Sequence, residues 1–252
     1  MLRACYGLTD AFFVGRVGTA ELAAIGGASF ASWIMLFVCD AFAVGVLSVA
    51  SEQEGAGERR EVGATVLQGL YASAAVAALL AATAPGWGRY FDLIGFSPLS
   101  PEHAAGTLYL RTMALGALPL AGSAISTGAL EGLGLMGRAL GVTLASVLVN
   151  FILDPLLIWG LGPFPRLGVA GAAVGTSVAA GVGLVLQLAL LRRAGLAFEL
   201  KPPDPKVIGR LFAIGAPMCV SGVAFCGVYL ALSRLLSSLV SGTCGLRGGA
   251  ED

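Results

Sequence analysis

Three aspartates stand inside strongly apolar stretches of this sequence. Asp10 lies in YGLTDAFFVG, Asp40 in LFVCDAFAVG and Asp154 in NFILDPLLIWG, and apolar residues flank each of them on both sides. An aspartate at the centre of a lipid bilayer costs about 2.5–3.5 kcal/mol on a membrane-insertion scale. Because carboxylates kept at such a cost typically serve ions or protons, all three are candidate site residues.

The strongest local pattern is the segment Asn150-Phe-Ile-Leu-Asp154-Pro155. Asn150 and Asp154 are four residues apart, so a helix places them on one face. Pro155 has no N–H and leaves the carbonyl of Phe151 without its helical partner. These oxygens suit a hard cation such as Na⁺, or a proton held on the carboxylate, and transporters build ion sites at broken helices. The alternative is a helix kink whose polar groups bond to neighbouring helices.

Other polar or helix-breaking residues carry less information by themselves. Thr9 or another helix could satisfy Asp10, and Asp40 is balanced between a site residue and a structural one. Thr176 has the spacing of an ordinary packing residue. Pro119 and Pro217 are expected to kink their helices.

The elements that would hold these residues are membrane helices. Hydrophobic residues make up 57% of the 252 residues, charged residues only 12%, and the mean hydropathy is +0.87, whereas a soluble domain carries about 25% charged residues. The long apolar runs lack the alternation of barrel strands. The sequence predicts an all-α, polytopic membrane helix bundle. The zero net charge gives no reason to expect a nucleic-acid partner, and five cysteines without CxxC spacing indicate no metal site.

Seven apolar stretches approach the length of a membrane span, which is about 20 residues. The first is short and the second is long enough to tilt or to extend beyond the bilayer, so we expect six spans and part of a seventh. The stretches are Met1–Val17, Leu22–Ala50, Val62–Ala84, Ala105–Gly128, Arg138–Gly160, Leu167–Leu191 and Val207–Leu236.

Basic residues are unevenly divided between the two alternate sets of loops. Pro85–Ala104 is expected to be a long loop in which His103 is solvated. Cytoplasmic loops carry an excess of Lys and Arg, which predicts a cytoplasmic N-terminus and cytoplasmic loops at 51–61, 131–137 and 192–206. One set holds Arg59, Arg60, Arg138, Arg192, Arg193, Lys201, Lys206 and Arg210, and the other holds Arg16, Arg89 and Arg166, with Arg111 near a helix end.

Several segments, in this order, resemble the multidrug and toxic compound extrusion (MATE) family, and the resemblance extends to about Leu236. The most specific is Asn150 to Pro155 followed by GLGPFP and GVAGAAVGT, which ends at Thr176. The others are TDAFFVGR from Thr9, GTAELAAIG from Gly18, Gly45 with the EGAGERRE loop, GALEGLGLMG from Gly128, and Gly215-Ala216-Pro217.

The resemblance implies a function and a set of site residues. It implies twelve helices in two lobes around a cavity that alternates between the membrane faces, and efflux of organic, often cationic, compounds in exchange for H⁺ or Na⁺ as the coupling ion, without another cofactor. It maps the cation site onto Asp10, Asn150, Asp154 and Thr176, while Asp40 matches no family motif. The expected location is the inner membrane, or an organellar membrane in a eukaryote.

This sequence departs from the family pattern in its extent. We expect residues 1–191 to form the six-helix lobe, 192–206 a cytoplasmic linker between lobes, 207–236 the start of the second lobe, and 237–252 a disordered or aberrant tail. The interpretation is a fragment or truncated gene product. A missing C-terminal lobe would then be the partner required for function.

Three other functions compete with drug efflux. A flippase for lipid-linked saccharides shares the two-lobe fold but tends to line its cavity with Arg and Lys, and no span centre here carries a basic residue. An intramembrane enzyme needs a nucleophile or a His pair, and the only histidine, His103, is placed in a loop. A truncated membrane fragment that does not transport is the third. We expect no catalytic residue.

Overall fold

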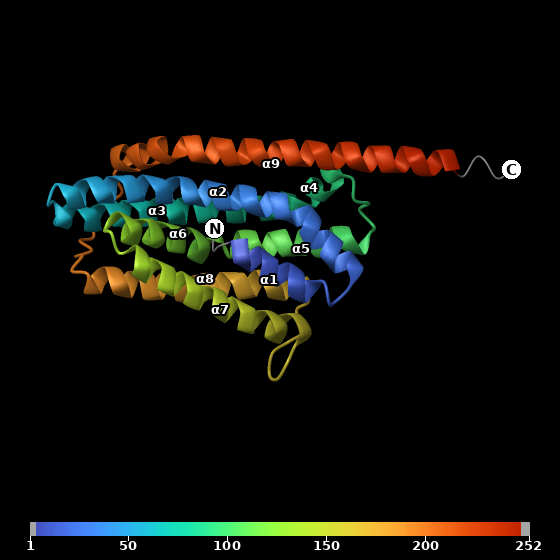
Figure 1. Ribbon diagram of the computed structural model, residues 1–252, viewed down its shortest axis with the longest axis horizontal. Coiled ribbons are helices and arrows are strands. Elements are labelled where there is room, and N and C mark those ends of the chain that lie inside the picture. Colours follow the sequence, from blue (N-terminus) through green and yellow to red (C-terminus); the bar gives the residue numbers. More distant parts are fainter. Residues whose placement is uncertain (1–3, 248–252) are drawn as a thin grey trace.

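The computed structural model describes residues 4–247, and this part of the chain folds into helices that lie roughly side by side along one long axis (Figure 1). In chain order these are α1 (Ala4–Val14), α2 (Thr19–Gly55), α3 (Arg59–Thr83), the 3₁₀ turn η1 (Ala84–Gly86), α4 (Trp87–Ile94), α5 (Pro101–Leu115), α6 (Ala117–Gly132), α7 (Met136–Trp159), α8 (Val169–Arg193) and α9 (Pro205–Arg247).

The helices confirm the predicted membrane bundle. Five helical segments within the described residues are long and apolar enough to cross a bilayer: α2, α3 continued through α4, α7, α8 and α9. The pair α5 and α6 passes the same test only as one span that is bent by 53°. α1 is a shorter apolar helix, as expected from the short first stretch.

The bend between α5 and α6 lies at Gly116 and not at Pro119, where the sequence placed it. A Cβ atom on Gly116 would come within 2.8 Å of the Ser177 Cβ and even closer to its Oγ, so α8 approaches the backbone at this point. Pro119 is instead the third residue of α6, where its missing N–H costs no helical bond. Pro155 and Pro217 lie inside α7 and α9.

The expected loop 85–104 is largely helical, which corrects the prediction. It contains most of η1, all of α4 and the first turn of α5. Ser100 caps α5 by accepting a bond from the His103 N–H (3.2 Å), and Pro101 opens the helix, a common start signal. His103 is not a free solvated residue, because its Nε2 lies 3.1 Å from both Asp92 Oδ1 and the Gly88 carbonyl.

The seventh apolar stretch also extends further than predicted. α9 continues past Leu236 to Arg247, into the segment where we expected a disordered or aberrant tail. Residues 248–252 of that predicted tail lie outside the described residues.

Glycines bring α9 close to α2. A Cβ atom on Gly215 would overlap the carbonyl of Ala41, and one on Gly45 would overlap the backbone of Leu211. Small residues permit such close helix packing in membranes. The exposed ion pair Arg210–Glu52 (2.7 Å) joins the same two helices near one end.

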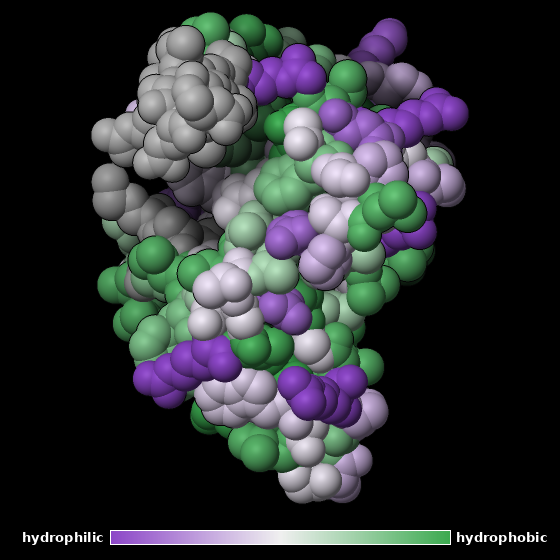
Figure 2. Space-filling model, turned by 90° about the vertical axis from the view of Figure 1, so that its right-hand side faces the viewer, coloured by the Kyte–Doolittle hydropathy of each residue, from purple (hydrophilic) through white to green (hydrophobic). Residues whose placement is uncertain are grey.

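The loops gather at the two ends of the bundle according to the predicted alternation (Figure 1). The turns after α2 and α6 and the α8–α9 linker lie at one end. There Gln68 of α3 donates to the Pro202 carbonyl (2.9 Å) and accepts from the Asp204 N–H (2.8 Å), which attaches the linker to the bundle. Figure 2 looks at the opposite end and shows hydrophilic residues spread among hydrophobic ones, as expected for helix ends near a membrane surface.

Candidate functional site

Three helices bring together the four residues to which the sequence assigned a cation site. α1 supplies Asp10, α7 supplies Asn150 and Asp154, and α8 supplies Thr176, and each of these side chains is at most 3% exposed. Asn150 Nδ2 donates to Asp154 Oδ1 (2.9 Å) and also lies 3.3 Å from Thr176 Oγ1.

Thr176 connects this pair to Asp10. Its hydroxyl donates to the Asp10 carboxylate, with Oγ1 lying 3.3 Å from Oδ1 and 3.4 Å from Oδ2. The result is a continuous chain of polar contacts from Asp154 through Asn150 and Thr176 to Asp10. Residues that are 166 positions apart in the sequence thus share one buried cluster.

Two further side chains, which the sequence analysis did not assign to the site, contact this cluster. Tyr109 of α5, 5% exposed, donates its hydroxyl to Asp10 Oδ2 (3.0 Å). Thr9 of α1 donates to Asn150 Oδ1 (2.6 Å). The signal for Tyr109 was its position inside an apolar span, because a buried tyrosine hydroxyl needs a polar partner; which partner it finds depends on the tertiary structure.

Asp154 keeps one oxygen open. Its Oδ2 is buried and has no hydrogen-bond partner among the described residues, and neither Asp154 nor Asp10 makes an ion pair with a described residue. A buried charged oxygen without a partner is costly. A proton on this oxygen, or a cation beside it, removes that cost.

Glycines on α8 allow the cluster to form. A Cβ atom on Gly175 would lie 2.8 Å from Asp154 Oδ1, and one on Gly171 would lie 2.7 Å from the carbonyl of Leu157. The two glycines are four residues apart and therefore lie on one face of α8, where they let α7 approach closely. The GAAVG segment thus positions Thr176 against α7.

A small cavity of about 70 Å³ reaches Asp10, Tyr109 and Thr176. The cavity extends along α2 past Ser32 to Trp33, whose side chain is partly exposed. This volume can hold a few water molecules. It offers a route by which an ion could approach the carboxylate of Asp10.

Asp40 does not belong to this cluster. It lies further along α2, where it lines a separate and larger cavity with Glu131. No group of three or more His, Cys, Asp or Glu residues that could hold a metal ion occurs among the described residues.

Comparison with known proteins identifies the family. The sequence profile of the MatE family matches residues 1–156, which is more than half of the chain. A probable multidrug resistance protein NorM of Deinococcus radiodurans is 31% identical over 89% of this chain and 49% of its own length. An FAD transporter of Shewanella oneidensis is also 31% identical, over 77% of this chain and 44% of its own.

The fold has solved counterparts as well. An inward-facing multidrug resistance MATE family transporter of the MOP superfamily superposes with a TM-score of 0.80 at 22% identity, over 89% of this chain and 51% of that one. The chain spans about half the length of the curated relatives that it matches. This membrane helix bundle belongs to the MatE family of multidrug transporters and corresponds to the N-terminal half of such a protein.

Proposed function

We propose that the chain is the N-terminal lobe of an efflux transporter that exports organic, often cationic, compounds in exchange for H⁺ or Na⁺. The observation that carries the proposal is the open, buried Oδ2 of Asp154 in a cluster that also holds the carboxylate of Asp10. Two buried carboxylates without a basic partner need a positive charge, since burial and mutual repulsion both disfavour the doubly charged state.

The coupling follows from which state of the transporter offers these carboxylates to the ion. The ion enters from the outer side, binds at Asp154 and Asp10 and neutralises them. The polar contacts between α1, α7 and α8 then change, and with them the bend of α7 near Pro155. A ligand shifts a two-state equilibrium only when it binds one state more tightly, so the outward-facing and inward-facing states must differ in this cluster.

Transport requires more than this lobe. The alternating cavity needs a second six-helix lobe, which we propose as the partner that completes the protein in the inner membrane. The excess of Lys and Arg at the end with the α8–α9 linker supports a cytoplasmic position for that end and for the N-terminus.

A flippase for lipid-linked saccharides receives less support from the lining of the cavities. Neither the cavity beside Asp10 nor the cavity beside Asp40 is lined by a Lys or Arg among the described residues. A pyrophosphate group would require such residues.

The proposal is tested by Asp154→Asn in the transporter that contains this chain as its N-terminal lobe. Dye efflux from everted vesicles is measured with an H⁺ gradient and a Na⁺ gradient imposed separately, which also identifies the coupling ion. We expect the variant to lose efflux at least about tenfold while its amount in the membrane stays unchanged, because removing one charged partner of a buried site costs more than about 1.4 kcal/mol.

Glu58→Gln serves as the matched control, because Glu58 is exposed on a turn remote from the cluster. It removes one carboxylate charge and should leave efflux within twofold (about 0.4 kcal/mol) of the unmodified protein. Ion-driven efflux that persists in Asp154→Asn would contradict the proposed coupling site.

A further inference from the structure

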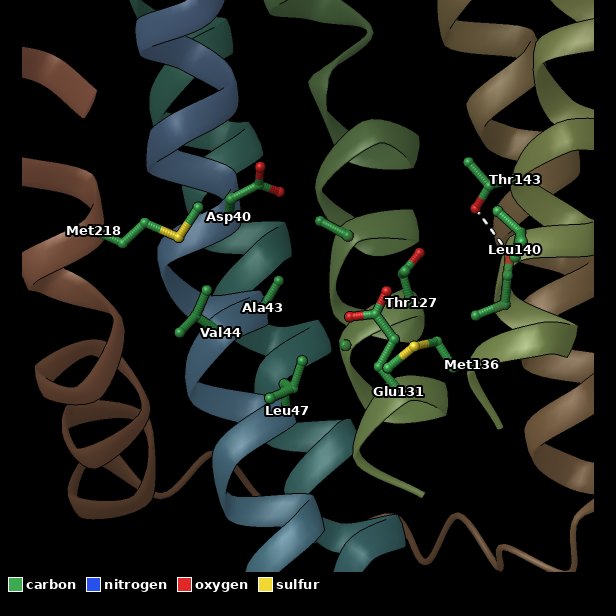
Figure 3. A pocket seen from close by; sticks show the side chains of 13 residues that line it. Asp40, Ala43, Val44, Leu47, Thr127, Glu131, Met136, Leu140, Thr143 and Met218 are labelled. Carbon is green, nitrogen blue, oxygen red and sulfur yellow. Dashed lines mark hydrogen bonds between the residues drawn. The ribbon is translucent and has the colours of Figure 1, made fainter. Parts of the chain in front are cut away.

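A second cavity lies toward the end of the lobe that carries the α6–α7 turn. Its volume is about 460 Å³, within the range of small-molecule sites, which is about 300–1,000 Å³. Helices α2, α6 and α7 form most of its wall and Met218 of α9 adds to it. In Figure 3, Asp40 projects from α2 on the side of α6, which contributes Thr127 and Glu131.

Carboxylates are the only charged groups that line this cavity among the described residues. Glu131 is half-buried, and its carboxylate makes neither a hydrogen bond nor an ion pair with a described residue. The carboxylate of Asp40 adds a second acidic group from another helix. A cavity with this lining attracts a cation and repels an anion.

The remaining wall is suited to an apolar body. It consists largely of aliphatic and thioether side chains, and several of them are free to adapt their shape because they are partly exposed. Met136, Leu140 and Met218 are 64%, 48% and 46% exposed. Figure 3 shows Met136 beside Glu131, so an apolar surface adjoins the carboxylate directly.

A buried polar group stands behind the same wall. Gln187 of α8, 1% exposed, donates its amide to Thr127 Oγ1 (2.8 Å), while its Oε1 has no hydrogen-bond partner among the described residues. The open oxygen is one more acceptor next to the cavity. It adds to the preference for a ligand that brings positive charge or a donor.

The cavity is distinct from the Asp10 cluster but shares helices with it. Along α2, the small cavity at Asp10 extends to Leu36 and the larger one begins at Asp40. Their centres, near Ser32 and Val44, are separated by about 18 Å along the helix at 1.5 Å per residue. On α7, Thr143 lines the larger cavity and lies two turns before Asn150, on the same face.

We propose that this cavity binds an amphipathic organic monocation, with Glu131 as the main charge partner and Asp40 as the second. The site rests on the proposed function in one respect, which is that the cation would be an export substrate entering from the side of the α6–α7 turn. Binding itself requires neither a gradient nor the second lobe.

The test compares two probes of the same shape and opposite charge, tetraphenylphosphonium and tetraphenylborate. Each is equilibrated by dialysis with the purified full chain in nanodiscs, and binding to protein-free nanodiscs is subtracted. We expect saturable protein-dependent binding of the phosphonium and none of the borate. Glu131→Gln should raise the phosphonium dissociation constant about five- to tenfold, because it removes the nearest charge, and Asp40→Asn should raise it less.

Two further variants keep the result decisive. Glu58→Gln makes the same chemical change outside the cavity and should leave the dissociation constant unchanged. Thr143→Leu fills part of the cavity without changing charge and should also weaken binding, even if the Glu131 variant is poorly produced. Equal binding of both probes, or equal affinity in Glu131→Gln and Glu58→Gln, would overturn the proposal.

The outcome is separable from that of the proposed function. If ion coupling at Asp154 is wrong, the phosphonium still binds and still depends on Glu131. If the cavity is not a cation site, the effect of Asp154→Asn on efflux is unaffected.

Discussion

Thr176 has a role at the scale of single residues that its type alone does not reveal. Its hydroxyl contacts both oxygens of Asp10 and the amide of Asn150, and it is the link in the polar chain between the two carboxyl groups. A hydroxyl can accept one bond and donate another, which lets a single small side chain transmit a change of charge at one aspartate to the other.

Thr176→Val removes this link while it conserves shape, and Thr176→Ser keeps the hydroxyl. We expect the valine variant to lose ion-driven efflux about five- to tenfold, since a buried hydrogen bond contributes about 1–1.5 kcal/mol, and the serine variant to retain most of it. Initial rates of dye efflux at saturating ion gradient measure the difference. Equal loss in both variants would indicate that packing by the methyl group, and not the hydroxyl, is what matters.

At the scale of elements, the contact between α2 and α9 depends on glycine. At Gly45 and Gly215 the backbone of one helix touches the backbone of the other, so there is no room for a side chain. This contact attaches the first helix beyond the linker to the six-helix lobe, and it carries Met218 to the wall of the larger cavity.

Gly215→Val should therefore separate the two helices and destabilise the chain by about 1–3 kcal/mol, the usual cost of overpacking. Gly209→Val is the matched control, because a Cβ at Gly209 of the same helix meets nothing within 4 Å. Thermal unfolding in detergent, followed by the remaining monodisperse protein after heating, compares them. Equal melting temperatures for the two variants would contradict a backbone contact at Gly215.

At the scale of the whole molecule, the two ends of the bundle differ in charge. The end with the α8–α9 linker carries most of the Lys and Arg residues, and the opposite end carries α4 and the 160–168 loop (Figure 1). An orientation with the basic end in the cytoplasm follows from the positive-inside rule.

Single cysteines test this orientation in a background without the native ones. Glu58→Cys and Pro165→Cys are both exposed and lie at opposite ends. A maleimide that cannot cross membranes should label Pro165→Cys on intact cells, and should label Glu58→Cys only after permeabilisation. The reverse pattern would place the basic end outside.

Much of this protein could be derived from its sequence, because the membrane makes the relation between sequence and structure simple. Every backbone polar group in lipid must be bonded internally, so long apolar stretches had to be helices, and the confirmed bundle follows from hydropathy. The cost of Asp10 and of the Asn150–Asp154 pair in lipid marked them as candidates before any contact was known. The resemblance added Thr176, while the ion-binding role of all four stays a prediction.

Only the tertiary structure decided which polar groups meet. Helix periodicity determines the face on which Asp154 or Tyr109 lies, but not the neighbour that this face meets, because that depends on how closely helices approach at positions such as Gly175. The same reason separates Asp10 from Asp40: both are aspartates in apolar spans, yet packing places one in a buried cluster and the other on the wall of a cavity with Glu131.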